Sequence, residues 1–297
     1  MTLKIDVVSK TYPNGAQALN GVTLTIPLGL HGLLGPNGAG KSTLMRTLAT
    51  LQEPDAGSVR LGAIDGIRET DRLRRTLGYL PQEFGVYPRA SAERLLDHFA
   101  ILEGYGQRSD RKAVVEDLLR KVNLWEVRKQ KLGGYSGGVR QRFGIAVALL
   151  GDPALMIVDE PTAGLDPVER VRFLNLLSEL SQESVVLLTH IVEDVSELCT
   201  RMAVIDGGEI LLEAVPLEIV ADLGGRIWRR VVDKGELASV EAKHSVISTK
   251  LLAGRTVVYA EADPGDAFEP AVPDMEDVYF ATMAGHVGRR QTLEVSA

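Results

Sequence analysis

The eight residues from Gly35 to Ser42 constrain the fold of this chain more than any other segment. They read Gly-Pro-Asn-Gly-Ala-Gly-Lys-Ser and fit the pattern G-x-x-x-x-G-K-[ST]. Glycines allow a tight turn whose N–H groups converge on phosphate oxygens, and the lysine and hydroxyl can reach the β- and γ-phosphates and Mg²⁺. The apolar pair Leu33-Leu34 precedes the loop and a helix-like segment, 43–48, follows it. The loop is therefore predicted to place a nucleotide phosphate at a helix N-terminus, where the N–H groups are unpaired and the dipole is positive.

Composition limits the class of protein. The chain has 297 residues, 45% of them hydrophobic and 25% charged, which is typical of a globular protein of about two domains. The net charge of −7 argues against nonspecific binding to nucleic acid or to an anionic membrane surface. The single cysteine, Cys199, excludes an internal disulfide, fits a reducing cytosol and is expected to be a buried, inert thiol. No signal peptide pattern and no apolar run of about 18 residues is found, so the chain is predicted not to span a membrane by itself.

Hydrophobic periodicity predicts an α/β sheet. Ala154–Val158 and Val185–Thr189 are nearly continuous apolar runs, as expected of buried parallel strands. Residues 167–182 between them carry a helical apolar face, which predicts a strand–helix–strand crossover. Further elements are predicted as strands at 3–8, 22–26 and 255–261, helices between Ala92 and about Val127 and from Val139 through Leu150, and a hairpin of 202–206 with 209–212.

Two adjacent acids end the strand predicted at 154–158. At the carboxyl end of a parallel strand, Asp159 can hold Mg²⁺ through water opposite Ser42. Glu160 lies one residue further, where a carboxylate can polarise an attacking water. The alternative interpretation is a pair of carboxylates that simply face solvent.

Taken together, these motifs resemble those of the ATP-binding-cassette (ABC) ATPases over about residues 1–215. The resemblance is carried, in the order of the family, by Tyr12, Gly35–Thr43, Gln82, Tyr135–Val139, Leu155–Glu160, Ala163–Asp166 and His190. It implies an α/β P-loop NTPase fold with a RecA-like core, an antiparallel β subdomain and a helical signature subdomain at about 86–150. The remaining residues, 216–297, are predicted to form a small C-terminal α+β accessory domain.

The resemblance also implies a site for ATP and Mg²⁺. The catalytic residues implied are Glu160, His190 and Gln82, and the metal-binding residues are Ser42, Gln82 and Asp159. The nucleotide-binding residues implied are Tyr12, Gly35, Pro36, Asn37, Gly38, Ala39, Gly40, Lys41, Ser42, Thr43, Ser136, Gly137, Gly138 and Asp166. Tyr12 would stack on adenine, and His190 would contact the γ-phosphate and orient Glu160.

Part of this site is expected to act on another subunit. In the family, Ser136, Gly137 and Gly138 would bind the γ-phosphate of ATP held by a second copy or a homologous cassette. Two chains would then sandwich two ATP molecules head to tail, with Asp166 crossing the interface.

The signature departs from the family at two positions. Tyr135 and Val139 stand where the family commonly has Leu and Gln. Valine cannot make the polar contacts of glutamine, so a ribose contact from position 139 is not expected. Because Ser136–Gly138, Glu160 and His190 are present, the chain is nevertheless predicted to be an active ATPase.

Two classes of function fit such a motor. The first is the ATPase subunit of a bacterial ABC transporter, held at the cytoplasmic face of the cell membrane by integral permease subunits. Segments 32–37, 159–167 and 275–280 resemble drug-export members, and an importer is the runner-up. The second class, soluble ABC ATPases acting on nucleic acid or ribosomes, typically has paired cassettes, long coiled coils or zinc-binding cysteines. Those features are missing from this sequence, and no nucleic-acid partner is expected.

Two further segments leave alternatives open. The apolar run Glu83–Tyr87 can form a docking groove for the permease or ordinary core packing. Arg226, Arg229 and Arg230 around Trp228 can contact lipid head groups or a partner, or can form a solvated charged face. Deletion of 220–297 is expected to leave the ATP-binding residues intact.

Overall fold

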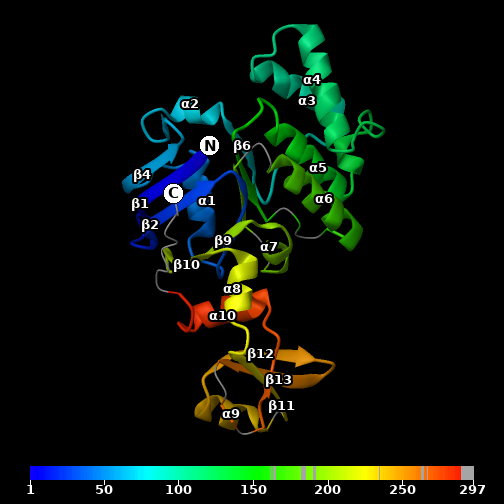
Figure 1. Ribbon diagram of the computed structural model, residues 1–297. Coiled ribbons are helices and arrows are strands. Elements are labelled where there is room, and N and C mark those ends of the chain that lie inside the picture. The colour runs from blue at the N-terminus through cyan, green and yellow to red at the C-terminus, as the bar shows by residue number, and fades with distance from the viewer. Residues whose placement is uncertain are drawn as a thin grey trace.

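The computed structural model describes residues 1–160, 162, 165–181, 185–189, 192–233, 235–261, 264–265 and 267–288. A central α/β body carries a helical lobe on one side and a small C-terminal lobe at the opposite end (Figure 1). The predicted α/β class and P-loop architecture are confirmed by this arrangement.

The main sheet places the phosphate loop at its centre. Its six strands lie in the order β10-β9-β3-β8-β7-β6, and every neighbouring pair is parallel except β9 and β10. The bounds are β3 Gly29–Leu34, β6 Leu77–Leu80, β7 Leu155–Asp159, β8 Val185–Thr189, β9 Arg201–Asp206 and β10 Glu209–Ala214. The predicted crossover between β7 and β8 and the predicted hairpin of β9 and β10 are confirmed.

A second, antiparallel sheet covers the first helix. Its order is β2-β1-β4-β5, with β1 at Thr2–Thr11, β2 at Gln17–Pro27, β4 at Ala56–Leu61 and β5 at Ile64–Asp65. Helix α1 (Lys41–Leu48) contributes Leu44, Met45 and Leu48 to a core shared with both sheets. The phosphate loop is therefore held between two sheets rather than at the edge of one.

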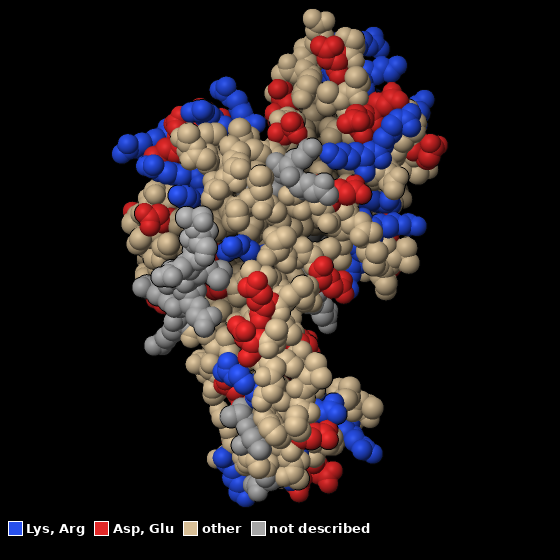
Figure 2. All heavy atoms as spheres, in the orientation of Figure 1, with Lys and Arg blue, Asp and Glu red and all other residues tan. Residues whose placement is uncertain are grey.

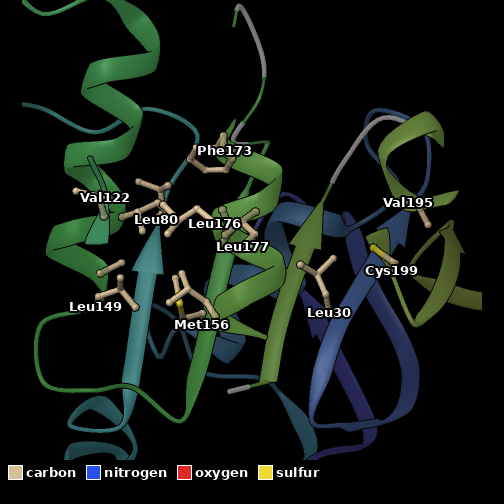
Figure 3. Packing of buried hydrophobic residues seen from close by; sticks show 14 of the residues in the cluster. Leu30, Leu80, Val122, Leu149, Met156, Phe173, Leu176, Leu177, Val195 and Cys199 are labelled. Atoms are coloured by element: carbon tan, nitrogen blue, oxygen red, sulfur yellow. The ribbon is translucent and has the colours of Figure 1, made fainter. Parts of the chain in front are cut away.

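The helical lobe and the helices beside the sheet follow the predicted apolar stripes. They are α2 Thr70–Arg74, α3 Ala92–Leu102, α4 Arg108–Lys121, the 3₁₀ turn η1 Leu132–Gly134, α5 Gly137–Ala148, α6 Pro167–Leu180 and α7 Val192–Leu198. The two apolar stripes predicted between Ala92 and about Val127 correspond to the two helices α3 and α4. Gly104 follows α3 with φ of 96°, a left-handed conformation that glycine adopts readily. Figure 3 shows Phe173, Leu176 and Leu177 of α6 directed at the strands that carry Leu80 and Met156.

The C-terminal chain forms a small sheet and then returns to the main body. It comprises α8 Pro216–Asp222, β11 Ile227–Val232, α9 Leu237–Lys243, β12 Val246–Leu252, β13 Arg255–Glu261, β14 Glu269–Pro270 and α10 Met275–Met283. The sheet order is β12-β13-β11-β14, all antiparallel. Helix α10 packs against α7, α8, β9 and β12. The predicted domain boundary at 215/216 falls between β10 and α8, and the main hydrophobic core continues across it.

The three arginines around Trp228 are paired within the C-terminal lobe. Arg226 pairs with Glu261, Arg229 lies 2.8 Å from Glu269, and Arg230 lies 3.9 Å from Glu236. Basic and acidic side chains are also interspersed on the face shown in Figure 2. This pairing favours the solvated charged face over a basic contact for lipid.

Two other expectations concern the single thiol and membrane-spanning helices. Cys199 is buried, as predicted for an inert thiol, and burial raises the pKa of that thiol. Of the helices in the described ranges, not one combines the length and the apolar character that crossing a membrane requires.

Candidate functional site

Glycine is required where the phosphate loop touches its neighbours. A Cβ on Gly35 would lie 2.2 Å from the carbonyl oxygen of Ile205 in β9, and one on Gly40 would lie 2.4 Å from that of Ala18 in β2. Gly40 also caps α1 with φ of 106°, in the left-handed region. The loop is thus wedged between the two sheets with its N–H groups at the start of α1. This arrangement fits a phosphate group.

The ammonium group of Lys41 lies against the backbone of this loop. Its Nζ donates to the carbonyl oxygens of Gly35, at 2.5 Å, and Pro36, at 3.0 Å. Burial lowers the pKa of Lys41, and the negative charges of Glu160 and Asp159 oppose that shift. The loop, the ammonium and both carboxylates therefore belong to one electrostatic site, and a phosphate could replace the carbonyls as partner of Nζ.

Tyr12 is fixed beside the first turn of α1. Its hydroxyl donates to Oε1 of Gln52 at 3.1 Å and therefore accepts from Oγ1 of Thr43, 3.2 Å away. Nε2 of Gln52 in turn donates to the carbonyl oxygen of Thr43 and to Oγ1 of Thr47. The ring is half-buried and next to the loop, whereas Ser42 is exposed at the start of the helix. Gln52 was missed by sequence reasoning, because a glutamine in a loop carries no signal for its distant partners.

The two acids lie at the end of β7, as the sequence predicted. Asp159 is buried and is paired in register with Thr189 of β8. Glu160 follows the strand with φ of 45°, a strained conformation for a residue with a side chain. Nε2 of Gln82 donates to Oε2 of Glu160 at 2.7 Å. Strand ends that are far apart in sequence thus place Gln82, Asp159 and Glu160 beside Lys41.

The signature residues begin a different helix. Ser136 caps α5, with Oγ accepting from the N–H of Val139 at 3.4 Å; Ser136 and Gly137 are exposed and Gly138 is buried. The unusual Tyr135 is buried, its hydroxyl donates to the carbonyl oxygen of Val127 at 2.9 Å, and burial raises its pKa. Val139 packs on the main core. The two departures from the family therefore serve local packing, and Ser136 and Gly137 remain exposed.

Asp166 is the N-cap residue of α6, as Ser136 is of α5. Its Oδ1 accepts from the N–H of Glu169 at 2.9 Å, which caps the helix. The predicted site residues thus fall into two groups: one around the phosphate loop, and one at the N-termini of α5 and α6. His190, Ala163 and Gly164 lie outside the described residues.

The apolar run Glu83–Tyr87 divides between the two predicted roles. Phe84 and Val86 pack partly buried on the main core, and a Cβ on Gly144 of α5 would lie 2.7 Å from Cζ of Phe84. Tyr87 is 68% exposed. Phe84 and Val86 therefore serve core packing that connects the segment after Gln82 to α5, whereas Glu83, Gly85 and Tyr87 are exposed.

The fold and the group of residues around the phosphate loop define a P-loop nucleoside triphosphatase. Residues 19–163 match the family described as ABC transporter. The chain is 35% identical over 259 residues to the daunorubicin/doxorubicin resistance ATP-binding protein DrrA of Streptomyces peucetius, across 86% of this chain and 76% of DrrA. This chain therefore belongs to the ABC transporter family, as an ATP-binding and ATP-hydrolysing subunit.

Two more comparisons define how far the similarity extends. The phosphonates import ATP-binding protein PhnC 2 of Synechococcus sp. (strain JA-2-3B'a(2-13)) is 37% identical over 241 residues, across 76% of this chain and 90% of PhnC 2. The dimeric post-hydrolysis structure of the ATP-binding cassette MJ0796 bound to ADP and Pi has a TM-score of 0.65 and 28% identity. That comparison covers 98% of MJ0796 but 72% of this chain. The chain therefore contains a complete cassette and additional residues.

Proposed function

We propose that this chain is the motor of an export-type ABC transporter, in which two cassettes enclose two ATP molecules and drive a membrane permease. The observation that carries the catalytic part is the hydrogen bond of 2.7 Å between Gln82 and Glu160. It joins the segment that packs on the helical lobe to the carboxylate best placed to activate water.

Glu160 is the proposed general base. Its carboxylate lies at the end of β7, within the electrostatic reach of Lys41, and the donor group of Gln82 fixes its orientation. A carboxylate in this position accepts a proton from water as the water attacks the γ-phosphate. Lys41 binds the phosphate oxygens and counters the negative charge that develops on them.

The donor set around the loop fits Mg²⁺ bound together with a nucleotide. Ser42 offers an exposed hydroxyl and Asp159 a buried carboxylate, and Gln82 keeps its amide oxygen for a cation because its nitrogen is engaged by Glu160. Within the ranges that the structure describes, protein side chains alone form no cluster of three acids, histidines or cysteines able to hold a metal. Held by Ser42, Gln82 and Asp159, Mg²⁺ would neutralise the negative charge of the phosphates.

The signature is proposed to act on the partner's ATP. Ser136 and Gly137 are exposed at the N-terminus of the twelve-residue helix α5, where a phosphate meets unpaired N–H groups. The similar cassette MJ0796 is described as dimeric with ADP and Pi. We expect ATP to close such a dimer and hydrolysis to loosen it, because the γ-phosphate is the group that both chains share.

Export is favoured over import by the extent of the alignments. The resistance protein DrrA aligns with 86% of this chain, and the import protein PhnC 2 with 76%. The resistance protein therefore aligns with a larger share of this chain than the import protein does. The proposed location is the cytoplasmic face of the membrane, with Tyr87 exposed among the surfaces available to a permease.

The test of catalysis is Glu160→Gln. We expect ATP binding to persist and hydrolysis to fall by about 10²-fold or more, because the amide keeps the shape of the side chain but cannot take a proton. Glu83→Gln removes a charge from the exposed neighbour of Gln82 and should keep the parental rate. Equal rates for Glu160→Gln and the parent protein would contradict the assignment.

The test of transport uses Glu160→Gln to trap the complex. Tagged protein is captured with ATP from detergent-solubilised membranes of its host, and the integral membrane protein that co-purifies is reconstituted with the parent chain. ATP-dependent uptake into inside-out vesicles would establish export, since ATP is then outside. Uptake only into right-side-out vesicles loaded with ATP would establish import, and capture of ribosomes or DNA-binding factors would contradict both.

A further inference from the structure

Glu169 lies where the two partner-facing motifs meet. It is the third residue of α6, and its N–H is the group that Asp166 caps at 2.9 Å. Sequence reasoning assigned it no role, because a glutamate in the first turn of a helix is commonly explained by the helix dipole alone.

Its side chain crosses to α5 and makes an ion pair there. Oε2 of Glu169 lies 3.1 Å from Nη2 of Arg142, and Oε1 accepts from Nη1 of Arg172 at 2.9 Å. The side chains of Glu169 and Arg142 are 17% and 12% exposed, whereas that of Arg172 is 58% exposed. The pair with Arg142 is therefore shielded from solvent, where charge interactions are stronger than at the surface.

The same side chain also lies against the signature backbone. A Cβ on Gly138 would lie 2.9 Å from Oε2 and 3.0 Å from Cβ and Cγ of Glu169. Glu169 therefore fills the space that the glycine leaves open. Glycine at this position allows α6 to approach the first turn of α5 closely enough for the carboxylate to reach Arg142.

We infer that Glu169 is a positioning residue that holds Ser136–Gly138 and Asp166 as one rigid unit for contact with the ATP of the partner. The inference rests on the proposed sandwich dimer. Each motif alone caps a helix, and caps by themselves do not fix two helix ends relative to each other. The pair of Glu169 with Arg142 and its contact with Gly138 supply that connection, so both motifs reach the partner together.

The experiment compares Glu169→Gln with Glu179→Gln in the full chain carrying Glu160→Gln. Glu179 lies on the same helix with an exposed side chain, so its substitution removes the same charge without touching α5. We measure binding of ATP to the single chain and ATP-dependent dimerisation by sedimentation. Glu169→Gln should bind ATP as the parent does but dimerise about tenfold more weakly, because small misplacement of contact groups is costly. Glu179→Gln should match the parent in both.

The outcomes separate this inference from the function on which it rests. If the Glu160→Gln parent itself stays monomeric with ATP, the sandwich and the role of Glu169 both fail. If the parent dimerises and Glu169→Gln dimerises equally well, only the role of Glu169 fails. Equal loss of ATP binding and dimerisation would indicate general destabilisation and would also overturn the inference.

A second variant tests whether the ion pair is the active contact. Arg142→Gln should weaken dimerisation as Glu169→Gln does, and the double variant should be no weaker than either single one. Additive losses in the double variant would show that the two side chains act separately and would contradict the inference.

Discussion

His31 shows how burial changes a single side chain. It lies in the central strand β3, is 4% exposed, and its Nε2 donates to the carbonyl oxygen of Pro27 at 2.9 Å. Burial lowers its pKa from 6.5 to about 4; backbone hydrogen bonds oppose this shift and the charge of Arg201 adds to it. The folded protein therefore holds a neutral imidazole at a pH where the unfolded chain binds a proton.

The pH dependence of stability should follow from His31. Between pH 6.5 and 4 the unfolded chain binds more protons, so the free energy of unfolding falls as the pH falls, by about 1.4 kcal/mol per unit from this group. Below pH 4 both states are protonated and this contribution levels off. Urea unfolding of His31→Gln should show a slope smaller by that amount. An unchanged slope in His31→Gln would refute the assignment.

At this scale, the sequence predicted residues whose chemistry is local and missed those defined by distant partners. Lys41, Asp159 and Glu160 follow from a loop and a strand end, where the backbone alone determines the position. Two contacts depend instead on which segments come together in the fold: the hydrogen bond of Tyr12 with Gln52 and the ion pair of Glu169 with Arg142. No periodicity encodes that choice.

Among the elements, helix α5 packs closely against strand β6. It lies flat on β6, and a Cβ on Gly78 would lie 2.2 Å from the carbonyl oxygen of Ala148. Because that neighbour is backbone, it cannot rotate away as a side chain can. The approach of α5 to the sheet is therefore limited by Gly78.

Gly78→Ala should push α5 away from β6 and destabilise the protein by about 1–3 kcal/mol, as expected for an overpacked contact. Denaturant unfolding measures this loss. Gly106→Ala is the matched control, since a Cβ there meets no atom within 4 Å and the change should be close to neutral. Equal stability of both variants would mean that the helix adjusts without cost.

The strength of the apolar pattern decided which elements could be predicted. Strands β7 and β8 were predicted from continuous apolar runs, and the structure pairs them in parallel as predicted; every residue of β7 is buried. The short elements β14, α8 and α9 have two to seven residues and were not predicted, because such segments have too few positions to show a period.

Across the whole molecule, the C-terminal chain is not separate from the cassette. Met275, Val278 and Ala281 of α10 are buried in the same core as Val195 and Cys199. Figure 3 shows these last two directed toward Leu30 of the sheet. Helix α7 is therefore packed between the sheet and α10. Deletion of 220–297 would therefore also remove part of the core that supports β3. That the ATP-binding residues stay intact in such a truncation remains a prediction.

Cys199 can report on the packing of α10 against α7 because it is the only thiol in the chain. Removal of 272–297 should speed the modification of Cys199 by a maleimide by about tenfold or more, since α7 loses packing and opens more often. The rate is followed by mass spectrometry under native conditions.

Truncation after Gly288 is the control, since it leaves α10 in place and should react as slowly as the full chain. If the longer deletion leaves the thiol equally protected, α10 does not stabilise α7. The sequence could not show this arrangement, because an amphipathic helix reveals which of its faces is apolar but not which distant surface covers it.

The order of the strands also sets when the site can exist during synthesis. Strand β3 leaves the ribosome early, whereas its neighbours β8 and β9 begin at Val185 and Arg201. At about 5–20 residues per second, the phosphate loop waits on the order of ten seconds for the strands that support it. The nascent chain should therefore gain affinity for ATP late and abruptly, and a ribosome stalled before β9 should display a chain that does not bind the nucleotide.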